Sequence, residues 1–237
     1  PGFQMTVIYG RRRIGKSTLI KEFIKEKKAV FFTATRAGIH RNLELLGKQA
    51  LEVLAPAVGA LAFENMDALF SFIGDSCQEE RTIIVIDEFP YLAEADGSIL
   101  SVLQNYIDNQ WLNGQMDLIL CGSSVSFMEN EVLSEKSPLF GRRTSQIKLE
   151  PFQYLDAAEF VPGYSREEQA ICYGVTGGVA KYLSLFDDSK SLDENIITQF
   201  FTKSGYLYEE TNNLLTQEFR NVSSYSDIIE AISSGAN

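Results

Sequence analysis

The amino-acid sequence predicts an α/β fold in which helices cover both faces of a parallel β-sheet. Short, uniformly apolar segments alternate along the chain with segments whose apolar residues recur at helical spacing. The apolar segments lack the polar–apolar alternation of half-exposed strands, which indicates burial on both faces, as in parallel sheets. Ligands of such sheets bind beyond the carboxyl ends of the strands, so the residues that follow each predicted strand are the candidates for chemistry.

The strongest strand signals are residues 5–9, an apolar run that ends at a glycine, and residues 82–86, which are all β-branched. Three further strands are expected at 29–33, 118–121 and 146–149.

Between the strands, apolar residues at intervals of three and four predict helices at 17–28, 42–54, 66–73 and 99–107. After Pro151 the pattern changes to helices only, which indicates a small helical lid, with Gly177 and Gly178 as a turn between two of its helices. The helices expected in this part are 154–160, 166–173, 179–186 and 192–202, with one more at 224–232.

One segment matches the phosphate-binding pattern G-x-x-x-x-G-K-[ST], the P-loop or Walker A motif, between a predicted strand and a predicted helix. Its glycines let the backbone wrap around phosphates, and the following helix adds the positive end of its dipole. Lys16 is expected to reach the β- and γ-phosphates, and Ser17 to bind Mg²⁺. A chance match in a turn is the alternative, which the flanking strand and helix disfavour. The predicted nucleotide-binding residues are Gly10, Arg11, Arg12, Arg13, Ile14, Gly15, Lys16, Ser17 and Thr18.

Two acids, Asp87 and Glu88, follow the predicted strand 82–86. Asp87 is expected to hold Mg²⁺ through water, as a Walker B aspartate, and Glu88 to act as the general base on the attacking water. Two solvated acids at a strand end are the alternative, but their position downstream of a P-loop favours function. The intervening strand 29–33 indicates that the two motif-bearing strands are not adjacent, which is typical of the additional-strand class of P-loop NTPases.

Ser123 follows the predicted strand 118–121 and is a candidate to hydrogen-bond the γ-phosphate or the attacking water. The alternative is a serine N-cap of the helix that begins near Val125, and Ser123 and Ser124 together can fill both roles.

Two groups of arginines are candidates for contacts with anions. Arg142 or Arg143 could stabilise the charge of the transition state, within the chain or from a neighbouring subunit, and a surface arginine pair is the alternative. Arg11, Arg12 and Arg13 are expected to point outward, because the backbone forms the phosphate cradle. For these three, pairing with local acids is favoured over contact with an anionic partner.

Composition and charge exclude several classes of function. The net charge of -11 argues against binding of polyanions over the whole surface, because phosphate contacts need a basic footprint. His40 is the only histidine and is predicted at the surface, which excludes His-cluster metal sites. No run approaches the ~20 apolar residues of a membrane helix. Three scattered cysteines fit neither a disulfide framework nor a zinc site, which indicates a reduced, cytoplasmic setting.

Together these residues resemble the prokaryotic and archaeal ATPase family within the STAND branch of the AAA+-like P-loop proteins. The resemblance covers essentially the whole chain and rests on residues 9–17, 86–92, 121–127, 139–143 and 149–152. It implies ATP with Mg²⁺ as the ligand, hydrolysis through Lys16, Ser17, Asp87 and Glu88, and switching or assembly governed by the nucleotide. No Asn/Thr-Lys-x-Asp element for guanine is present.

The resemblance also implies the domain organisation, with a P-loop ATPase core at 1–150, a helical lid at 151–212 and the start of a truncated winged-helix segment at 213–237. The chain begins at Pro1, without the upstream element that helps to hold adenine in the family, so we expect a fragment of a longer protein. Ala180 replaces the proline of the family's Gly-Gly-x-Pro lid motif. A DNA or protein partner is expected to bind through the region beyond this chain.

Two alternatives to an ATPase that acts as a switch are kept. The first is a nucleotide-gated module that binds a partner or DNA, in which hydrolysis only resets the state. The second is a P-loop kinase, against which Glu88 argues.

Overall fold

Within the residues that the structure describes, four apolar segments and one exposed, mostly polar segment, residues 145–148, form strands that pair into one parallel sheet. The structure, a computed structural model, describes residues 2–59, 61–218 and 222–235. The chain divides into two compact units, Pro1–Glu150 and Pro151–Asn237, and the sheet belongs to the first. The strands are β1 Gln4–Tyr9, β2 Ala29–Thr33, β3 Thr82–Asp87, β4 Met116–Gly122 and β5 Ser145–Lys148.

The order of the strands in the sheet is β2-β3-β4-β1-β5, and all neighbours are parallel. The predicted separation of β1 and β3 is therefore confirmed. The strand that separates them is β4, whereas β2, which lies between them in the sequence, is at the edge of the sheet. Consecutive β-strands need not be spatial neighbours when helical crossovers connect them.

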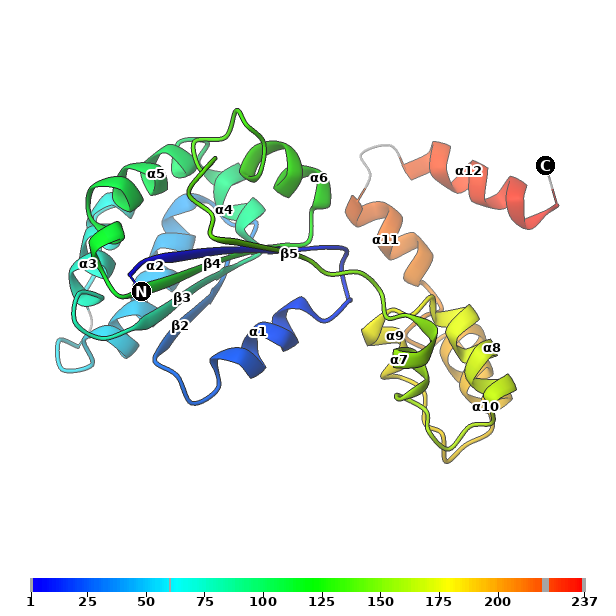
Figure 1. Cartoon of the computed structure of the whole chain (residues 1–237). Coiled ribbons are helices and arrows are strands. Elements are labelled where there is room, and N and C mark those ends of the chain that lie inside the picture. Colours follow the sequence, from blue (N-terminus) through cyan, green and yellow to red (C-terminus); the bar gives the residue numbers. More distant parts are fainter. Residues whose placement is uncertain (1, 60, 219–221, 236–237) are drawn as a thin grey trace. The chain divides into compact units, whose positions relative to one another are not determined.

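Helices cover both faces of the sheet, as predicted (Figure 1). Alternate residues of a strand point to opposite faces. In β1, Val7 belongs to the larger apolar cluster and Ile8 to the smaller one, which includes Ile20 of α1. The larger cluster lies under helices α2 to α5. The helices of this unit are α1 Lys16–Ile24, α2 Ile39–Leu54, α3 Met66–Ser76, α4 Phe89–Ala95, α5 Ile99–Asn109 and α6 Val125–Phe127, with a 3-10 turn at Trp111–Asn113 and a π turn at Met128–Val132.

The second unit is helical and has its own apolar cluster, which includes Val161, Cys172 and Leu183. Buried Asn195 bridges its segments, because its amide nitrogen donates to the hydroxyl of Tyr164 at 2.7 Å. The helices are α7 Tyr154–Ala158, α8 Arg166–Thr176, α9 Ala180–Leu183, α10 Leu192–Ile196, α11 Glu210–Glu218 and α12 Val222–Ser233, with a π turn at Ile197–Phe201.

Several predicted boundaries differ from the structure. The first helix ends at Ile24 rather than at residue 28, because Lys25 takes the extended ψ of 133°. Helix α4 was not predicted; it is short, and a proline in its first turn supplies a backbone angle suited to a helix start. The helix expected at 192–202 is α10 followed by the π turn, and α11 spans the expected boundary between 212 and 213.

Other expectations concern exposure. His40 is exposed, as predicted, and the three cysteines are free and buried. Gly177 ends α8 in the left-handed conformation, with φ of 59°, which confirms the predicted turn. None of the helices in the described part of the chain has the length and apolarity needed to span a bilayer.

Truncation of a fully buried side chain in the central strand tests the burial of β4 in the core. Leu118 of β4 is inaccessible to solvent, so Leu118→Ala is expected to lower the free energy of unfolding by about 2–5 kcal/mol. Urea unfolding followed by the fluorescence of Trp111, the only tryptophan, measures this value for the first unit. Leu19→Ala, at a side chain that is 47% exposed on α1, is the matched control and should change stability by less than about 1 kcal/mol. Equal effects of the two substitutions would contradict the placement of β4.

Candidate functional site

The segments that follow β1, β3 and β4 meet at the carboxyl ends of the strands. The three strands are neighbours in the order β3-β4-β1 and run parallel, with Tyr9 opposite Gly122 and Ile86 opposite Leu120. Their carboxyl ends therefore bring together the P-loop, the acid pair and the serine pair that were predicted separately from the sequence.

The backbone of the P-loop adopts conformations that favour glycine. Gly10 has φ of 148°, and a Cβ atom there would lie 2.2 Å from the carbonyl oxygen of Leu149. Gly15 has φ of 96° at the N-cap of α1, and Arg13 also has a positive φ, of 68°. The side chain of Ile14 is buried, which anchors the middle of the loop. The loop is thus a tight cradle made by the main chain, at the start of a helix.

The side chain of Lys16 folds back into this loop. It is only 6% exposed, and its ammonium donates to the carbonyl oxygens of Gly10 at 2.9 Å and Arg11 at 2.8 Å. Burial lowers the pKa of Lys16 below its ordinary value, while the negative charges of Glu88 and Asp87 oppose this shift. The expectation that Lys16 reaches the β- and γ-phosphates stays a prediction.

Ser17 and Asp87 are in direct contact across the gap between α1 and β3. The hydroxyl of Ser17 donates to Oδ2 of Asp87 at 2.7 Å, and the backbone N–H of Glu88 donates to the other oxygen at 3.0 Å. Asp87 is 4% exposed. The Cys121 thiol is buried beside it, and burial together with the Asp87 carboxylate raises the pKa of Cys121, which keeps the thiol protonated. Cys121 was not predicted as part of the site, because an apolar strand residue carries no sequence signal for it.

Glu88 and Ser123 form a second contact at the carboxyl ends of the strands. The hydroxyl of Ser123 donates to Oε2 of Glu88 at 2.7 Å, and the backbone N–H of Ser123 lies 3.3 Å from the same oxygen. Glu88 has φ of 51° and ψ of 41°, a left-handed conformation that is uncommon for a non-glycine residue. Ser124 stands at the N-cap of α6, but its side chain makes no capping hydrogen bond.

Arg12 of the P-loop makes a contact that differs from the predicted pairing with an acid. The guanidinium of Arg12 donates to the hydroxyl of Tyr91 in α4, rather than to a carboxylate. Arg11 and Thr18 are exposed. Tyr91 was missed in the sequence, although it lies within the segment 86–92 that carries the family resemblance.

Within the chain, Arg142 and Arg143 do not lie at the carboxyl ends of the strands, where the P-loop is. They precede β5, whose Ser145 pairs with Thr6 near the start of β1, and β5 runs parallel to β1. Arg142 makes a two-pronged ion pair with Asp108 at the end of α5, and Arg143 donates to the carbonyl of Leu133. An arginine finger from these residues to their own P-loop has no geometric support, and one from a neighbouring copy stays a prediction.

The donor set at the site suits a magnesium–nucleotide complex. The hydroxyl of Ser17 and the carboxylate of Asp87 are hard oxygen ligands, and Mg²⁺ is commonly held by one or two protein oxygens together with phosphates and waters. Within the described residues no group of three or more His, Cys, Asp or Glu could hold a metal by itself. The glycine cradle and the Lys16 ammonium supply the donors that phosphates require.

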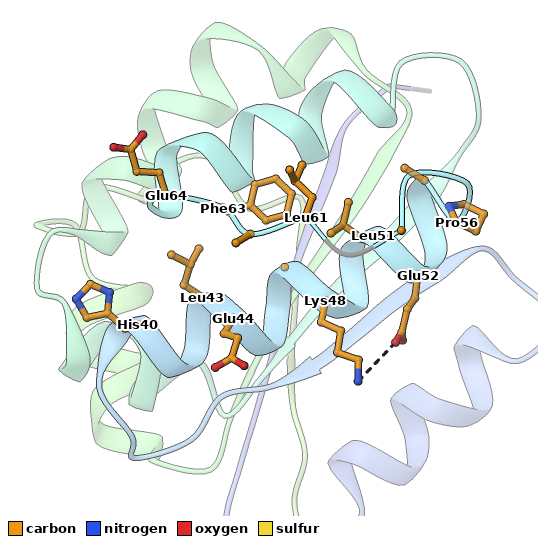
Figure 2. Close-up of a pocket in the computed structure, with 14 residues that line it drawn as sticks. His40, Leu43, Glu44, Lys48, Leu51, Glu52, Pro56, Leu61, Phe63 and Glu64 are labelled. Carbon is orange, nitrogen blue, oxygen red and sulfur yellow. Dashed lines mark ion pairs between the residues drawn. The ribbon is translucent and has the colours of Figure 1, made fainter.

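A hollow of about 580 Å³ lies elsewhere, between α2 and the segment that leads to α3 (Figure 2). Leu43 and Leu51 of α2 line it together with Leu61 and Phe63, and the ring of Phe63 packs against Gly47. None of the predicted nucleotide-binding or catalytic residues lines this hollow.

Comparison with protein families gives a match over most of the chain. The family of ATPase domains that occur predominantly in Archaea matches residues 2–186. An uncharacterized protein of Methanocaldococcus jannaschii is 33% identical over 233 residues, which are 98% of this chain and 50% of that protein. This chain therefore spans about half the length of that relative. A second uncharacterized protein of this archaeon is 31% identical over 94 residues, which cover 38% of this chain and 87% of that protein.

Solved structures show the same fold. A Walker-type ATPase of Pyrococcus abyssi has a TM-score of 0.67 at 20% identity, over 98% of this chain and 75% of that one. The Drosophila ORC bound to DNA has a TM-score of 0.58 at 14% identity, over 93% of this chain and 64% of that one. A signal transduction ATPase with numerous domains from Pyrococcus horikoshii, which carries a tetratricopeptide repeat sensor, has a TM-score of 0.51 at 20% identity, over 90% and 30%.

Alanine at the first glycine of the P-loop tests the cradle. Gly10→Ala places a methyl group against the Leu149 carbonyl at a positive φ, so we expect the free energy of unfolding to fall by about 1–3 kcal/mol. Gly97→Ala is the matched control, because a Cβ atom there meets nothing within 4 Å. Urea unfolding and titration with ADP and Mg²⁺ measure stability and binding. A Gly10→Ala variant as stable as Gly97→Ala would show that the loop does not have this conformation.

Proposed function

Because the chain belongs to the family of ATPase domains that occur predominantly in Archaea, we propose that it binds ATP with Mg²⁺ at the P-loop and hydrolyses it. The observation that carries this proposal is the pair of contacts at the carboxyl edge of the sheet, Ser17 with Asp87 and Ser123 with Glu88. They place a hydroxyl–carboxylate ligand set and a candidate base on adjoining strand ends.

The roles of the chain's own residues follow from chemistry. Lys16 and the loop N–H groups bind the β- and γ-phosphates, and the lysine exchanges its two carbonyl partners for phosphate oxygens. Ser17 and Asp87 would hold Mg²⁺, which would supply positive charge to the phosphates. Glu88 accepts a proton from water as the water oxygen bonds to the γ-phosphorus and the bond to the bridging oxygen of ADP breaks.

Ser123 sets how readily Glu88 does this. Its hydroxyl donates a hydrogen bond to Oε2 of Glu88. The carboxylate loses this hydrogen bond whenever Oε2 turns toward the attacking water. This contact favours slow turnover and a long-lived ATP state, which supports a role as a nucleotide-controlled switch. A cytoplasmic location is part of the proposal and is supported by three free, buried cysteines.

A nucleotide-gated module that binds a protein or DNA partner is the second candidate, in which hydrolysis only resets the state. The same Ser123–Glu88 contact favours it, because a held base prolongs the bound state. The net charge of -11 restricts a DNA partner to a local basic surface. In this case Lys16→Ala abolishes partner binding, and Glu88→Gln keeps the partner bound.

The central experiment compares Glu88→Gln with Lys16→Ala in steady-state ATP hydrolysis and in nucleotide binding. Lys16→Ala should lose nucleotide binding, because it removes the buried ammonium of the loop. Glu88→Gln should keep binding and lose about 100- to 10,000-fold in kcat, the usual contribution of a general base. Glu79→Gln, at an exposed position before β3, is the control and should match the wild type. Wild-type turnover in Glu88→Gln would refute the assigned base.

Self-association through an arginine finger predicts that ATPase activity per molecule rises with protein concentration. Arg142→Ala should abolish the rise. Asp108→Asn is the control, because it breaks the same ion pair but keeps the arginine, and such partly exposed pairs contribute only about 0–1 kcal/mol. Activity per molecule measured across concentration for the three proteins decides the matter. A flat profile in the wild type contradicts a finger supplied by a second copy.

A further inference from the structure

Tyr91 lies between two guanidinium groups that come from different strand ends. The guanidinium of Arg12, after β1, donates to its hydroxyl. The guanidinium of Arg36, after β2, lies 5.0 Å from the centre of its ring, in a cation–π contact. Tyr91 itself is in α4, directly after β3. The two contacts use different parts of the side chain, because Arg36 lies over the face of the ring and Arg12 binds the hydroxyl.

Arg12 is close to the phosphate-binding lysine. Burial is the main cause that lowers the pKa of Lys16, and the positive charge of Arg12 adds to it. Like charges repel each other, so a fixed partner for Arg12 offsets the cost of keeping it near Lys16. The Tyr91 hydroxyl is an uncharged acceptor, so it holds the guanidinium without neutralising it, and the loop keeps its positive potential for phosphates.

Tyr91 also makes a hydrogen bond to Glu88, the residue assigned as the general base. Its backbone N–H donates to the carbonyl oxygen of Glu88 at 2.9 Å, in the first turn of α4. Glu88 has the left-handed backbone conformation, which persists only when the surroundings hold it. The backbone N–H of Tyr91 stabilises this conformation, and its hydroxyl accepts a hydrogen bond from Arg12 of the P-loop. A single residue therefore connects the phosphate cradle to the base.

We propose that the hydrogen bond from Arg12 to Tyr91 couples the P-loop to the turn that carries Glu88, which makes Tyr91 a positioning residue for hydrolysis. This inference rests on the proposed function of the same site. Phosphates that draw the P-loop into its bound shape act, through Arg12 and Tyr91, on the backbone of Glu88. The coupling affects the orientation of the base and therefore kcat, whereas Lys16 keeps its own contacts with the loop carbonyls, which do not involve Tyr91.

Tyr91→Phe removes the hydroxyl and keeps the ring under Arg36, so it isolates the coupling. Loss of a hydrogen bond to a charged group predicts a fall in kcat of about tenfold. KM for ATP and affinity for ADP should be unchanged, and the melting temperature should fall no further than in Tyr106→Phe, which also loses a hydrogen bond of a tyrosine hydroxyl. Tyr106→Phe is the matched control. It removes a hydroxyl that donates to the carbonyl of Asp67, on a half-buried tyrosine of α5, and should leave kcat unchanged.

A double-mutant cycle tests whether Arg12 and Tyr91 act through one bond. If they do, Arg12→Gln combined with Tyr91→Phe lowers kcat no further than the stronger single substitution. Arg12→Lys, which keeps a positively charged donor, should retain more kcat than Arg12→Gln, whose amide donor is uncharged. Steady-state hydrolysis, ADP titration and thermal unfolding of the whole chain supply the measurements.

Three results overturn the inference. These are an unchanged kcat in Tyr91→Phe, a loss explained by weaker binding or by a melting temperature below that of Tyr106→Phe, and additive effects in the cycle. The proposed function fails in a distinguishable way, because the wild type and Tyr106→Phe then hydrolyse no ATP either. An active wild type whose kcat is insensitive to Tyr91→Phe removes the coupling and leaves the ATPase assignment standing.

Discussion

The parallel pairing of β4 with both β1 and β3 is the constraint on which the site depends. Neighbouring strands lie about 4.8 Å apart, so one inserted strand sets the P-loop and the acid pair about 10 Å from each other. Across that gap the first turn of α1 brings the hydroxyl of Ser17 to Asp87. The end of β4 fills the space between with Gly122, where a Cβ atom would lie 2.6 Å from the sulfur of Met128 and 2.9 Å from Pro90. The spacing of the site is therefore a property of the sheet.

The site combines several groups that are unfavourable on their own. Lys16 and Asp87 are buried charged residues, and Glu88 has a strained backbone. Each is stabilised by a specific neighbour, namely the loop carbonyls for Lys16, Ser17 for Asp87 and Ser123 for Glu88. Buried polar groups retain stability only when such partners are present. The large apolar clusters on the two faces of the sheet provide the stability against which this local cost is set.

The fold alone does not specify what the nucleotide controls. Proteins with the same fold include a Walker-type ATPase, an ORC bound to DNA and a signal transduction ATPase with a repeat sensor. Function in shared folds is decided by sites and by attached segments. In this chain the contacts described at the carboxyl ends of the strands are made by residues of the first unit, and the helical unit has an apolar core of its own.

The sequence by itself determined the class of fold, the five strands, the P-loop and the acid pair. These features are local, because apolar runs and glycine spacing act on the chain segment that carries them. Only the tertiary structure decided that β4 rather than β2 separates β1 from β3, that Ser123 meets Glu88, and that Arg12 is bonded to Tyr91 rather than to an acid. It also placed Arg142 against Asp108, away from the P-loop of its own chain. These partners are distant along the chain, and the order in which strands pair selects them, which no local pattern encodes.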